Sequence, residues 1–296
     1  MRNNDERSGA KKAHQGSPPL QTGPPRPPVN AASAPSFPLD FVNPTTFVAL
    51  PSKGALYPAG HSLSGVAEVE IRQMTAKQED ILTSPTLLKK GVAIDRFVQS
   101  LMVDSTINVN DLLVGDKNAI LIAARVEGYG AQYTTAVICP SCSERAEYEF
   151  DLAAYQNELE EEASPESLPE NITVNDTGHY VVSLEMGWDV EIKPLTSSDE
   201  KKIAKTLEQR KKAKMVESVI SEQLRAMIVS ISGHTDRAVI NKAINMMPVK
   251  SSRALRDAYS AVVPNVDLKR DFNCPHCGTD TRMEVPLSAE FFWPRQ

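Results

Sequence analysis

All four cysteines of this 296-residue chain fall in two Cys-Pro-X-Cys motifs, and this placement constrains the fold more than any other feature. The first motif contains Cys139 and Cys142, and the second contains Cys274 and Cys277. Each motif stands between two strand-like segments, which is the layout of half a zinc ribbon. The fold must therefore bring together two hairpins that lie more than a hundred residues apart in the sequence.

The spacing of the cysteines favours a structural metal site. Zn²⁺ prefers four tetrahedral soft ligands, and two intervening residues let both thiolates of one motif reach the same ion. Proline after the first cysteine restricts each turn and lowers the entropy lost on closing it. We therefore predict one Zn²⁺ per chain, with these ligands: Cys139, Cys142, Cys274 and Cys277. Four thiolates leave no position for water, so a catalytic zinc is not expected. Nearby basic residues are expected to offset part of the thiolate charge: Arg145, Lys269, Arg270 and Arg282.

Two other interpretations of the cysteines remain open. A thioredoxin-like redox pair also uses Cys-Pro-X-Cys, but its first cysteine opens a helix, whereas a strand is expected after each motif here. A metal-free cluster of buried cysteines is the second alternative. The opening sequence "MRNNDERSGAKK" lacks an apolar segment, so we expect a protein made in a reducing cytoplasm, where structural disulfides are rare.

Composition and motifs narrow the class of function. The net charge of −6 argues against nonspecific coverage of duplex DNA, which needs a cationic face. No apolar run approaches the roughly 18 residues that span a bilayer, so no membrane partner is expected. The chain has no GxSxG, P-loop or HExxH motif and no GxGxxG after a strand. We predict no enzymatic activity, no catalytic or cofactor-binding residue and no small-molecule substrate.

The chain divides by composition into segments of different character. We predict an α+β fold of helices with short strands and β-hairpins, whose two halves are joined by the cysteine site. The expected segments are a disordered proline-rich arm (1–45), an α+β core ending in the first cysteine motif (46–150), an acidic loop (151–178), a β-hairpin with a helical insert (179–265) and the second motif with an aromatic C-terminus (266–296).

Several local signals predict where helices begin. Thr75 and Gln78 have the spacing of a capping box, and Ser197 and Glu200 suggest a second one. Apolar residues at helical spacing predict that the second helical region continues through 216–231. Further helices are expected in "VAIDRFVQSLM" and "DKNAILIAARVEGYG", and a hairpin is expected in "HYVVSLEMGWDVEIKPL".

Two surface features have more than one interpretation. The basic stretch 201–214 is expected to be a solvated helix face that meets an acidic partner. The alternative is a nucleic-acid contact, although the stretch has no aromatic residues for stacking. The cluster Phe291, Phe292 and Trp293 forms either an interface anchor or the core of the cysteine hairpins. For function we take these aromatic residues as exposed anchors.

Several quoted stretches together resemble a known family. They are "LPSKGALYP", "MTAKQEDILTSPTLLKKGVAIDRFVQSLM", "DLLVGDKNAILIAARVEGYG" and "YTTAVICPSC". The chain is similar over roughly 47–150, and again at the closing "CPHC…VPL…FFWP", to the T4-type phage baseplate proteins. This resemblance implies a non-enzymatic component of the baseplate hub of a contractile tail. Its implied partners are other baseplate, hub or tail proteins.

The same resemblance implies a location. Such a protein is made in the host cytoplasm during assembly and is then expected in the baseplate of the virion tail. Whether it stays in the particle or leaves as an assembly factor is left open. The alternative function is a zinc-ribbon regulator that binds nucleic acid, which would combine the metal site with the basic stretch 201–214.

Overall fold

The computed structural model describes residues 43–153, 155, 168–175, 178–216, 218–285 and 289–292. All but the last three positions of the predicted arm 1–45 lie outside the described residues. Most of the acidic loop 151–178 and Trp293 lie outside them too. None of the described helices is long and apolar enough to cross a membrane.

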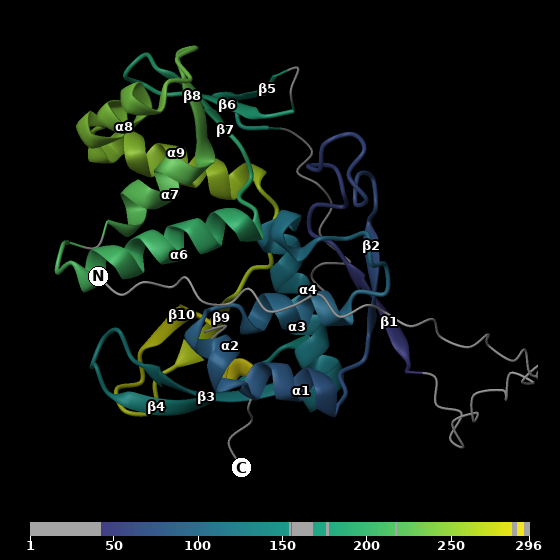
Figure 1. Ribbon diagram of the computed structural model, residues 1–296. Helices are drawn as coiled ribbons and strands as arrows, with labels where there is room; N and C mark the ends of the chain where they lie inside the picture. The colour runs from purple at the N-terminus through teal and green to yellow at the C-terminus, as the bar shows by residue number, and fades with distance from the viewer. Residues whose placement is uncertain are drawn as a thin grey trace, which may run out of the picture. The chain divides into compact units, whose positions relative to one another are not determined.

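The first part of the chain combines two antiparallel strand pairs with helices (Figure 1). Strand β1 (Thr45–Ala49) pairs with β2 (Glu68–Arg72), and β3 (Gln132–Ile138) pairs with β4 (Arg145–Asp151). The helices between the two pairs are α1 (Ala76–Thr83), α2 (Pro85–Lys89), α3 (Ala93–Leu101), the 3₁₀ helix η1 (Val109–Asp111) and α4 (Val114–Tyr129). Gly130 ends α4 with a φ of 85°, as the glycine-rich end of "ARVEGYG" indicates.

The second part contains a four-stranded antiparallel sheet in the order β5–β6–β7–β8 (Figure 1). Its strands are β5 (Ile172–Val174), β6 (Tyr180–Ser183), β7 (Asp189–Ile192) and β8 (Ile228–Ile231). Its helices are α6 (Ser197–Lys212), α7 (Val219–Met227), α8 (Arg237–Met246) and α9 (Val249–Val262). The chain then forms the hairpin of β9 (Lys269–Asn273) and β10 (Asp280–Glu284), followed by the 3₁₀ helix η2 (Ala289–Phe292).

The mixed α+β class and the predicted hairpins are confirmed, but two local predictions are wrong. The region 216–231 is not one helix, because α7 ends at Met227 and the chain continues as β8, which pairs with β7. The second capping box uses Thr196 and Asp199 instead of Ser197 and Glu200. Helix α6 therefore begins at Ser197, one position earlier than a cap at Ser197 implies. The first capping box, Thr75 with Gln78, is confirmed.

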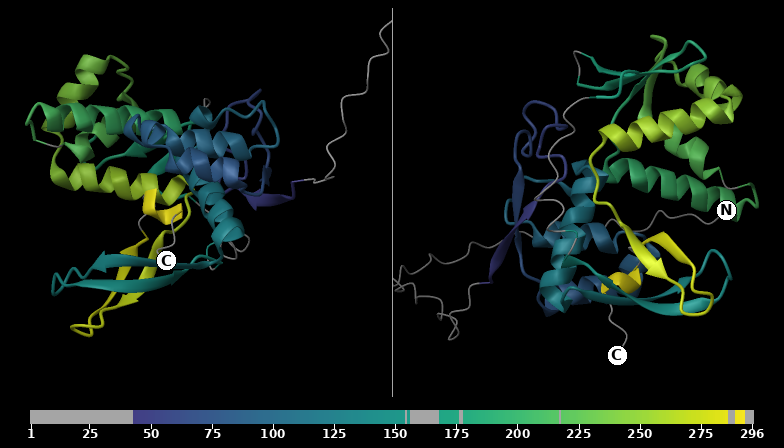
Figure 2. Two further views of the ribbon diagram at one scale, coloured as in Figure 1. Left: turned by 60° about the horizontal axis from the view of Figure 1, so that its bottom comes forward. Right: turned by 180° about the vertical axis from the view of Figure 1, so that it is seen from behind.

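Two hydrophobic cores organise the described residues. The first core takes its side chains from 48–155 and from 266–292, two stretches separated by the whole second part. The second core lies within 172–262. Figure 2 shows the consequence from two directions, because the hairpin β9–β10 lies beside the hairpin β3–β4 in both views.

The two parts are tied together at the start of α4. The Val114 N–H donates to the Leu195 carbonyl at 3.0 Å, and the Ser197 N–H donates to the Leu112 carbonyl at 2.8 Å. Gly115 lies so close to the segment after α9 that an added Cβ would be 2.3 Å from the Pro264 carbonyl oxygen. Only glycine permits so close an approach. The segment that passes Gly115 connects α9 to β9.

The aromatic residues near the C-terminus are core residues, which corrects the prediction that they are exposed anchors. Phe291 and Phe292 are each about 1% exposed. Their rings make edge-to-face contacts with Tyr133 at 5.0 Å and with Phe97 at 4.8 Å, respectively. Burial of large aromatic surface outweighs any benefit of exposing it. Trp293, the third member of the cluster, lies outside the described residues.

Candidate metal centre

The two Cys-Pro-X-Cys turns share one backbone structure. In each turn the N–H of the first cysteine donates to the carbonyl five residues later, and the N–H four residues later donates back to the carbonyl of that cysteine. These distances are 2.9 and 2.9 Å around Cys139, and 3.0 and 2.8 Å around Cys274. Because the strands β3–β4 and β9–β10 are paired on either side, each turn is held at the end of a hairpin.

A left-handed residue closes each turn at the same position. It is Ser143 in the first turn, with a φ of 61°, and Gly278 in the second, with a φ of 68°. Glycine adopts this conformation readily, whereas a serine there is strained by its Cβ. The two turns thus have the same backbone geometry, but the backbone of the first turn is the more strained.

The hairpins bring the four thiols together. The sulfur atoms of Cys139 and Cys277 are 3.8 Å apart, as are those of Cys142 and Cys274, and all four lie within 4.8 Å of one another. Four sulfurs at the usual Zn–S distance of 2.3 Å occupy the corners of a tetrahedron with edges of about 3.8 Å. These separations are far longer than a disulfide bond, and all four cysteines are free. The donor set therefore fits a tetrahedral metal ion.

Hydrogen bonds to the sulfur atoms favour thiolates at two positions. The Ser141 N–H donates to the Cys139 sulfur at 3.4 Å, and the Thr279 hydroxyl lies 3.2 Å from the Cys277 sulfur. The hydroxyl and backbone of Thr279 lower the pKa of Cys277 to about 6. The pKa of Cys139 is also lowered, chiefly by the backbone N–H of Cys142. These lowered pKa values favour the thiolate form that a divalent cation binds, whereas the pKa of Cys142 is raised to about 12.

Two of the four basic residues predicted to balance the thiolates, Arg270 and Arg282, have other partners. Arg282 pairs with Asp267 at 3.2 Å and with Asp271 at 3.8 Å. The guanidinium of Arg270 lies 3.5 Å from the centre of the Tyr155 ring. These contacts stabilise the second hairpin. None of them involves a cysteine sulfur. His276 is exposed, as expected for the outward-facing position of its turn.

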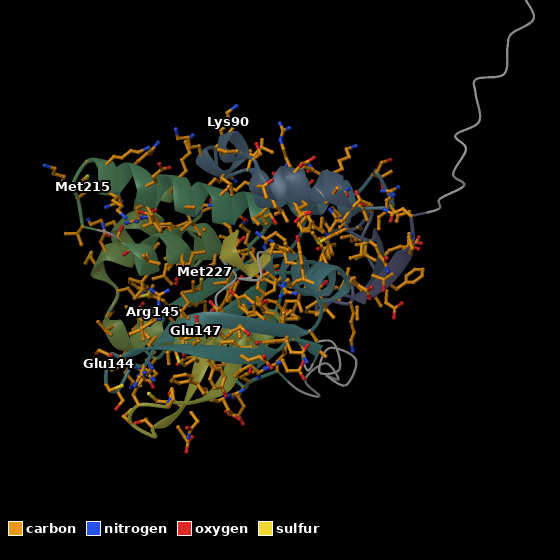
Figure 3. All side chains as sticks on the ribbon, turned by 90° about the horizontal axis from the view of Figure 1, so that it is seen from below. Lys90, Glu144, Arg145, Glu147, Met215 and Met227 are labelled. Carbon is orange, nitrogen blue, oxygen red and sulfur yellow. The ribbon has the colours of Figure 1, made fainter. Side chains whose placement is uncertain are left out.

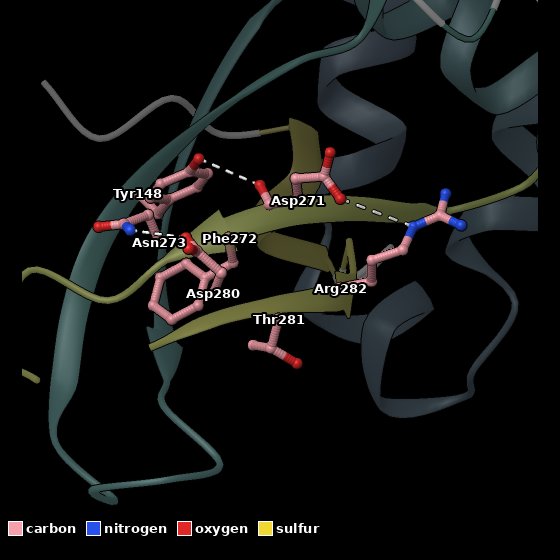
Figure 4. A pocket seen from close by; sticks show the side chains of 7 residues that line it. All are labelled: Tyr148, Asp271, Phe272, Asn273, Asp280, Thr281 and Arg282. Atoms are coloured by element: carbon pink, nitrogen blue, oxygen red, sulfur yellow. Dashed lines mark hydrogen bonds and ion pairs between the residues drawn. The ribbon is translucent and has the colours of Figure 1, made fainter. Parts of the chain in front are cut away.

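A pocket of about 460 Å³ lies between the two hairpins (Figure 4). It is lined by Tyr148, Asp271, Phe272, Asn273, Asp280, Thr281 and Arg282. The Tyr148 hydroxyl donates to the Asp271 carbonyl at 3.1 Å, and its ring packs edge-to-face on Phe272 at 5.0 Å. These contacts fasten β4 to β9 beside the cysteines. The hairpins are therefore joined by packing as well as by the proposed metal ligands.

The comparison with protein families gives one match, which covers residues 44–293 and is described as T4 bacteriophage base plate protein. The chain belongs to this family. The comparisons with curated proteins and with solved structures found no match. The family match runs through 151–265, a region where the resemblance read from the residues was weak or absent. The acidic loop and the basic helix α6 are thus part of the family region of this base plate protein.

A buried arginine of this base plate protein fixes η2 to the start of β3. Arg125 of α4 is about 1% exposed and donates to three backbone carbonyls. Its Nε bonds to Phe291 at 2.9 Å, and its other two nitrogens bond to Gly130 at 2.7 Å and Gln132 at 3.1 Å. One side chain thus holds η2, the end of α4 and the start of β3 in register. Sequence analysis missed it because an arginine in an apolar helix gives no sign of its partners.

A buried carboxylate links two of the stretches that carry the family resemblance. Asp116 of α4 accepts hydrogen bonds from the Ser52 N–H at 3.0 Å, the Ser52 hydroxyl at 2.7 Å and the Tyr57 hydroxyl at 2.7 Å. Tyr57 in turn accepts from the Leu113 N–H at 3.1 Å. Burial raises the pKa of Asp116 even though these donors favour its ionised form. The network joins "LPSKGALYP" to "DLLVGDKNAIL", because each stretch supplies hydrogen-bond partners for the other.

Proposed function

We propose that this base plate protein is a non-enzymatic structural or assembly component of the hub of a contractile-tail baseplate, and that a structural zinc stabilises it. The family match supports a structural role in the baseplate. The observation that carries the zinc proposal is the gathering of Cys139, Cys142, Cys274 and Cys277 within 4.8 Å. The bound metal would act as a cross-link between the two hairpins.

The four thiolates would hold Zn²⁺ with no open position, so the site would serve stability and not turnover. The chain's own part is to place the ligands. The strand pairs β3–β4 and β9–β10 position the turns, and the backbone hydrogen bonds within each turn aim both cysteines at one point. The packing of Tyr148 on Phe272 keeps the hairpins side by side.

We also propose that 46–150 and 266–296 form one domain, into which 179–265 is inserted. The two hydrophobic cores support this division, because the first draws on both ends and the second on the inserted region alone. The proposed partners are other baseplate, hub or tail proteins. The proposed location is the host cytoplasm during assembly and then the tail of the virion.

Two measurements on phage particles test the hub proposal. A null mutant in this gene should yield particles that lack complete baseplates, seen by electron microscopy. Mass spectrometry of purified wild-type particles should detect the chain if it is retained, and its absence from complete particles would identify a released assembly factor. Normal, infectious tails from the null mutant would refute the proposal. Salt-sensitive binding of the purified protein to DNA would favour the nucleic-acid alternative instead.

A further inference from the structure

Exposed apolar side chains gather where α6 meets α7. Among the described residues of this region, Met215, Val216, Val219 and Ile220 are all large, apolar and exposed, and Val216 is 85% exposed. Figure 3 shows Met215 beyond the end of α6 at the edge of the view, whereas the buried Met227 of α7 lies in the interior. Single exposed apolar residues are ordinary, but several at adjacent positions mark a surface for interaction.

This apolar group borders the most basic stretch of an acidic chain. Residues 201–214 contain seven basic residues and one acidic residue, a net charge of +6 in a chain whose total is −6. Lys201, Lys202, Arg210 and Lys212 form ion pairs within the protein. In the part of the chain that the structure describes, no ion pair is recorded for Lys211 or Lys214. Their charges therefore remain available to a partner.

Lys214 stands at a position that suits glycine better. The Met215 N–H donates to the Arg210 carbonyl at 2.9 Å and the Lys214 N–H donates to the Lys211 carbonyl at 3.0 Å, which is the Schellman pattern at a helix end. The central residue of this pattern is left-handed, and Lys214 has a φ of 54°. A lysine costs about 1 kcal/mol more than glycine there. Strain of this kind is often found where a side chain has a function.

We propose that the surface formed by Lys211, Lys214, Met215, Val216, Val219 and Ile220 binds an acidic segment of another protein, one that presents apolar side chains beside its carboxylates. We call it the 211–220 surface. The apolar side chains would cover those of the partner, and the two lysines would meet its carboxylates at the rim. This inference concerns a partner surface and does not depend on zinc or on the hub proposal.

The chemistry of the 211–220 surface favours this occupant over nucleic acid and over an anionic lipid surface. Nucleic acid would match the lysines, but it offers nothing to four exposed aliphatic side chains, and the surface has no aromatic residue for base stacking. An anionic lipid surface is bound by longer amphipathic faces with deeply inserted aromatic or leucine residues. A second copy of this acidic chain would supply carboxylates, and self-association is therefore one outcome of the test.

The test uses the full-length protein and a defined probe. The probe is a synthetic helix of about 15 residues with glutamates on one face and leucines on the other, and the control helix replaces each glutamate by lysine. Fluorescence anisotropy should show that the protein binds the acidic helix and not the control helix. Its affinity for the acidic helix should fall when the salt concentration is raised from about 0.05 to about 0.3 M. Single-stranded DNA and vesicles containing phosphatidylserine serve as probes of the other two classes.

Matched variants separate the surface from the fold. Lys214→Gly should weaken binding of the acidic helix about two- to fivefold while leaving the cap intact or improved. Its control is Lys53→Gly, the same change at another left-handed lysine, with a φ of 46°. Val216→Ser should weaken binding further, whereas Val249→Ser, at a residue with a similar exposed fraction of 83%, should not.

Some outcomes would overturn the inference. One is equal affinity of the acidic helix for the wild type, Lys214→Gly and Val216→Ser, and another is no binding of that helix at low salt. Binding of the DNA or the vesicles that both variants weaken would assign the surface to another class of partner. Self-association that Val216→Ser abolishes, measured by analytical ultracentrifugation, would assign it to a second copy.

Discussion

At the residue scale, Ser143 and Gly278 hold equivalent left-handed positions in the two cysteine turns, but only glycine suits that backbone. No atom lies within 4 Å of a Cβ added to Gly278, so a substitution there meets backbone strain and no clash. Gly278→Ala should lower the free energy of unfolding by about 1 kcal/mol. Ser143→Gly should leave it within about 0.5 kcal/mol of the wild type or raise it.

Urea denaturation of the metal-loaded proteins would measure both changes. Ser143→Ala provides the control, because it keeps the Cβ and the strain while removing the hydroxyl. If Gly278→Ala and Ser143→Gly destabilise the protein equally, the two turns do not share the geometry described above.

The buried carboxylate of Asp116 should give a distinctive pH dependence. Its pKa is raised in the folded state by burial, so the folded protein holds this proton at pH values where the unfolded chain has lost it. The contribution of Asp116 to stability is therefore largest at low pH and falls as the pH rises from about 4 through the raised pKa. The stability of the wild type minus that of Asp116→Asn should decrease over this range.

Urea denaturation of both proteins at about pH 4 and about pH 8 would measure this difference. All other titrating groups, the cysteines included, are common to the two proteins and cancel in the comparison. A difference that is constant with pH would show that the hydrogen bonds from Ser52 and Tyr57 balance burial, and one that grows with pH would show that they outweigh it.

Residues differ in how far the sequence reveals them. The gathering of the four cysteines was predicted because two Cys-Pro-X-Cys motifs between strands favour one shared site. Arg125 and Asp116 were not, because their partners are backbone groups and side chains remote in the sequence. The partner of Arg282 was not predictable for the same reason, since it is close in sequence to Cys277 but pairs with Asp267.

At the element scale, η2 depends on one side chain of α4. Arg125→Met removes the donor to the Phe291 carbonyl and to two further carbonyls, which are then left partly buried and unpaired. We expect a loss of about 2–4 kcal/mol in the free energy of unfolding. Amide hydrogen exchange should accelerate in η2 and at the start of β3. Arg145→Met, at an exposed arginine of β4, should change stability by less than about 0.5 kcal/mol.

An Arg125→Met protein with wild-type stability and unchanged exchange in η2 would contradict this role. Arg125→Lys distinguishes charge from geometry, because a lysine keeps the charge but cannot bond three carbonyls in a planar fork. Its stability should lie between those of the wild type and Arg125→Met.

Helices and strands marked by local sequence patterns were predictable. A strand that forms only by pairing with a segment distant in the sequence was not. Alternating apolar residues predicted the hairpin of β6 and β7, and the Thr75–Gln78 capping box predicted the start of α1. Strand β8 was missed because Leu224, Met227, Ile228 and Ile231 continue a helical spacing. This segment forms a strand because it pairs with β7, and no local sequence pattern indicates that pairing.

At the scale of the whole molecule, the four cysteines lie on two hairpins that the whole second part separates in the sequence. Side chains from 48–155 and from 266–292 already pack in one hydrophobic core. A bound metal would therefore further stabilise a contact that this packing also stabilises. Structural zinc contributes roughly 10–16 kcal/mol of apparent binding free energy in small peptides, which is comparable with the stability of an entire domain. The sequence predicted the meeting of the two motifs but not the packing of Phe291 on Tyr133 and of Phe292 on Phe97.

The central claim is that one zinc ion, bound by cysteines from both ends of the chain, joins β3–β4 to β9–β10. Zinc-edge X-ray absorption of the full-length protein, purified under reducing conditions with its metal content determined, measures this most directly. We predict about one zinc per chain, surrounded by four sulfur atoms at about 2.3 Å. A zinc bound by nitrogen or oxygen atoms, or a folded protein that contains no metal, would contradict the claim.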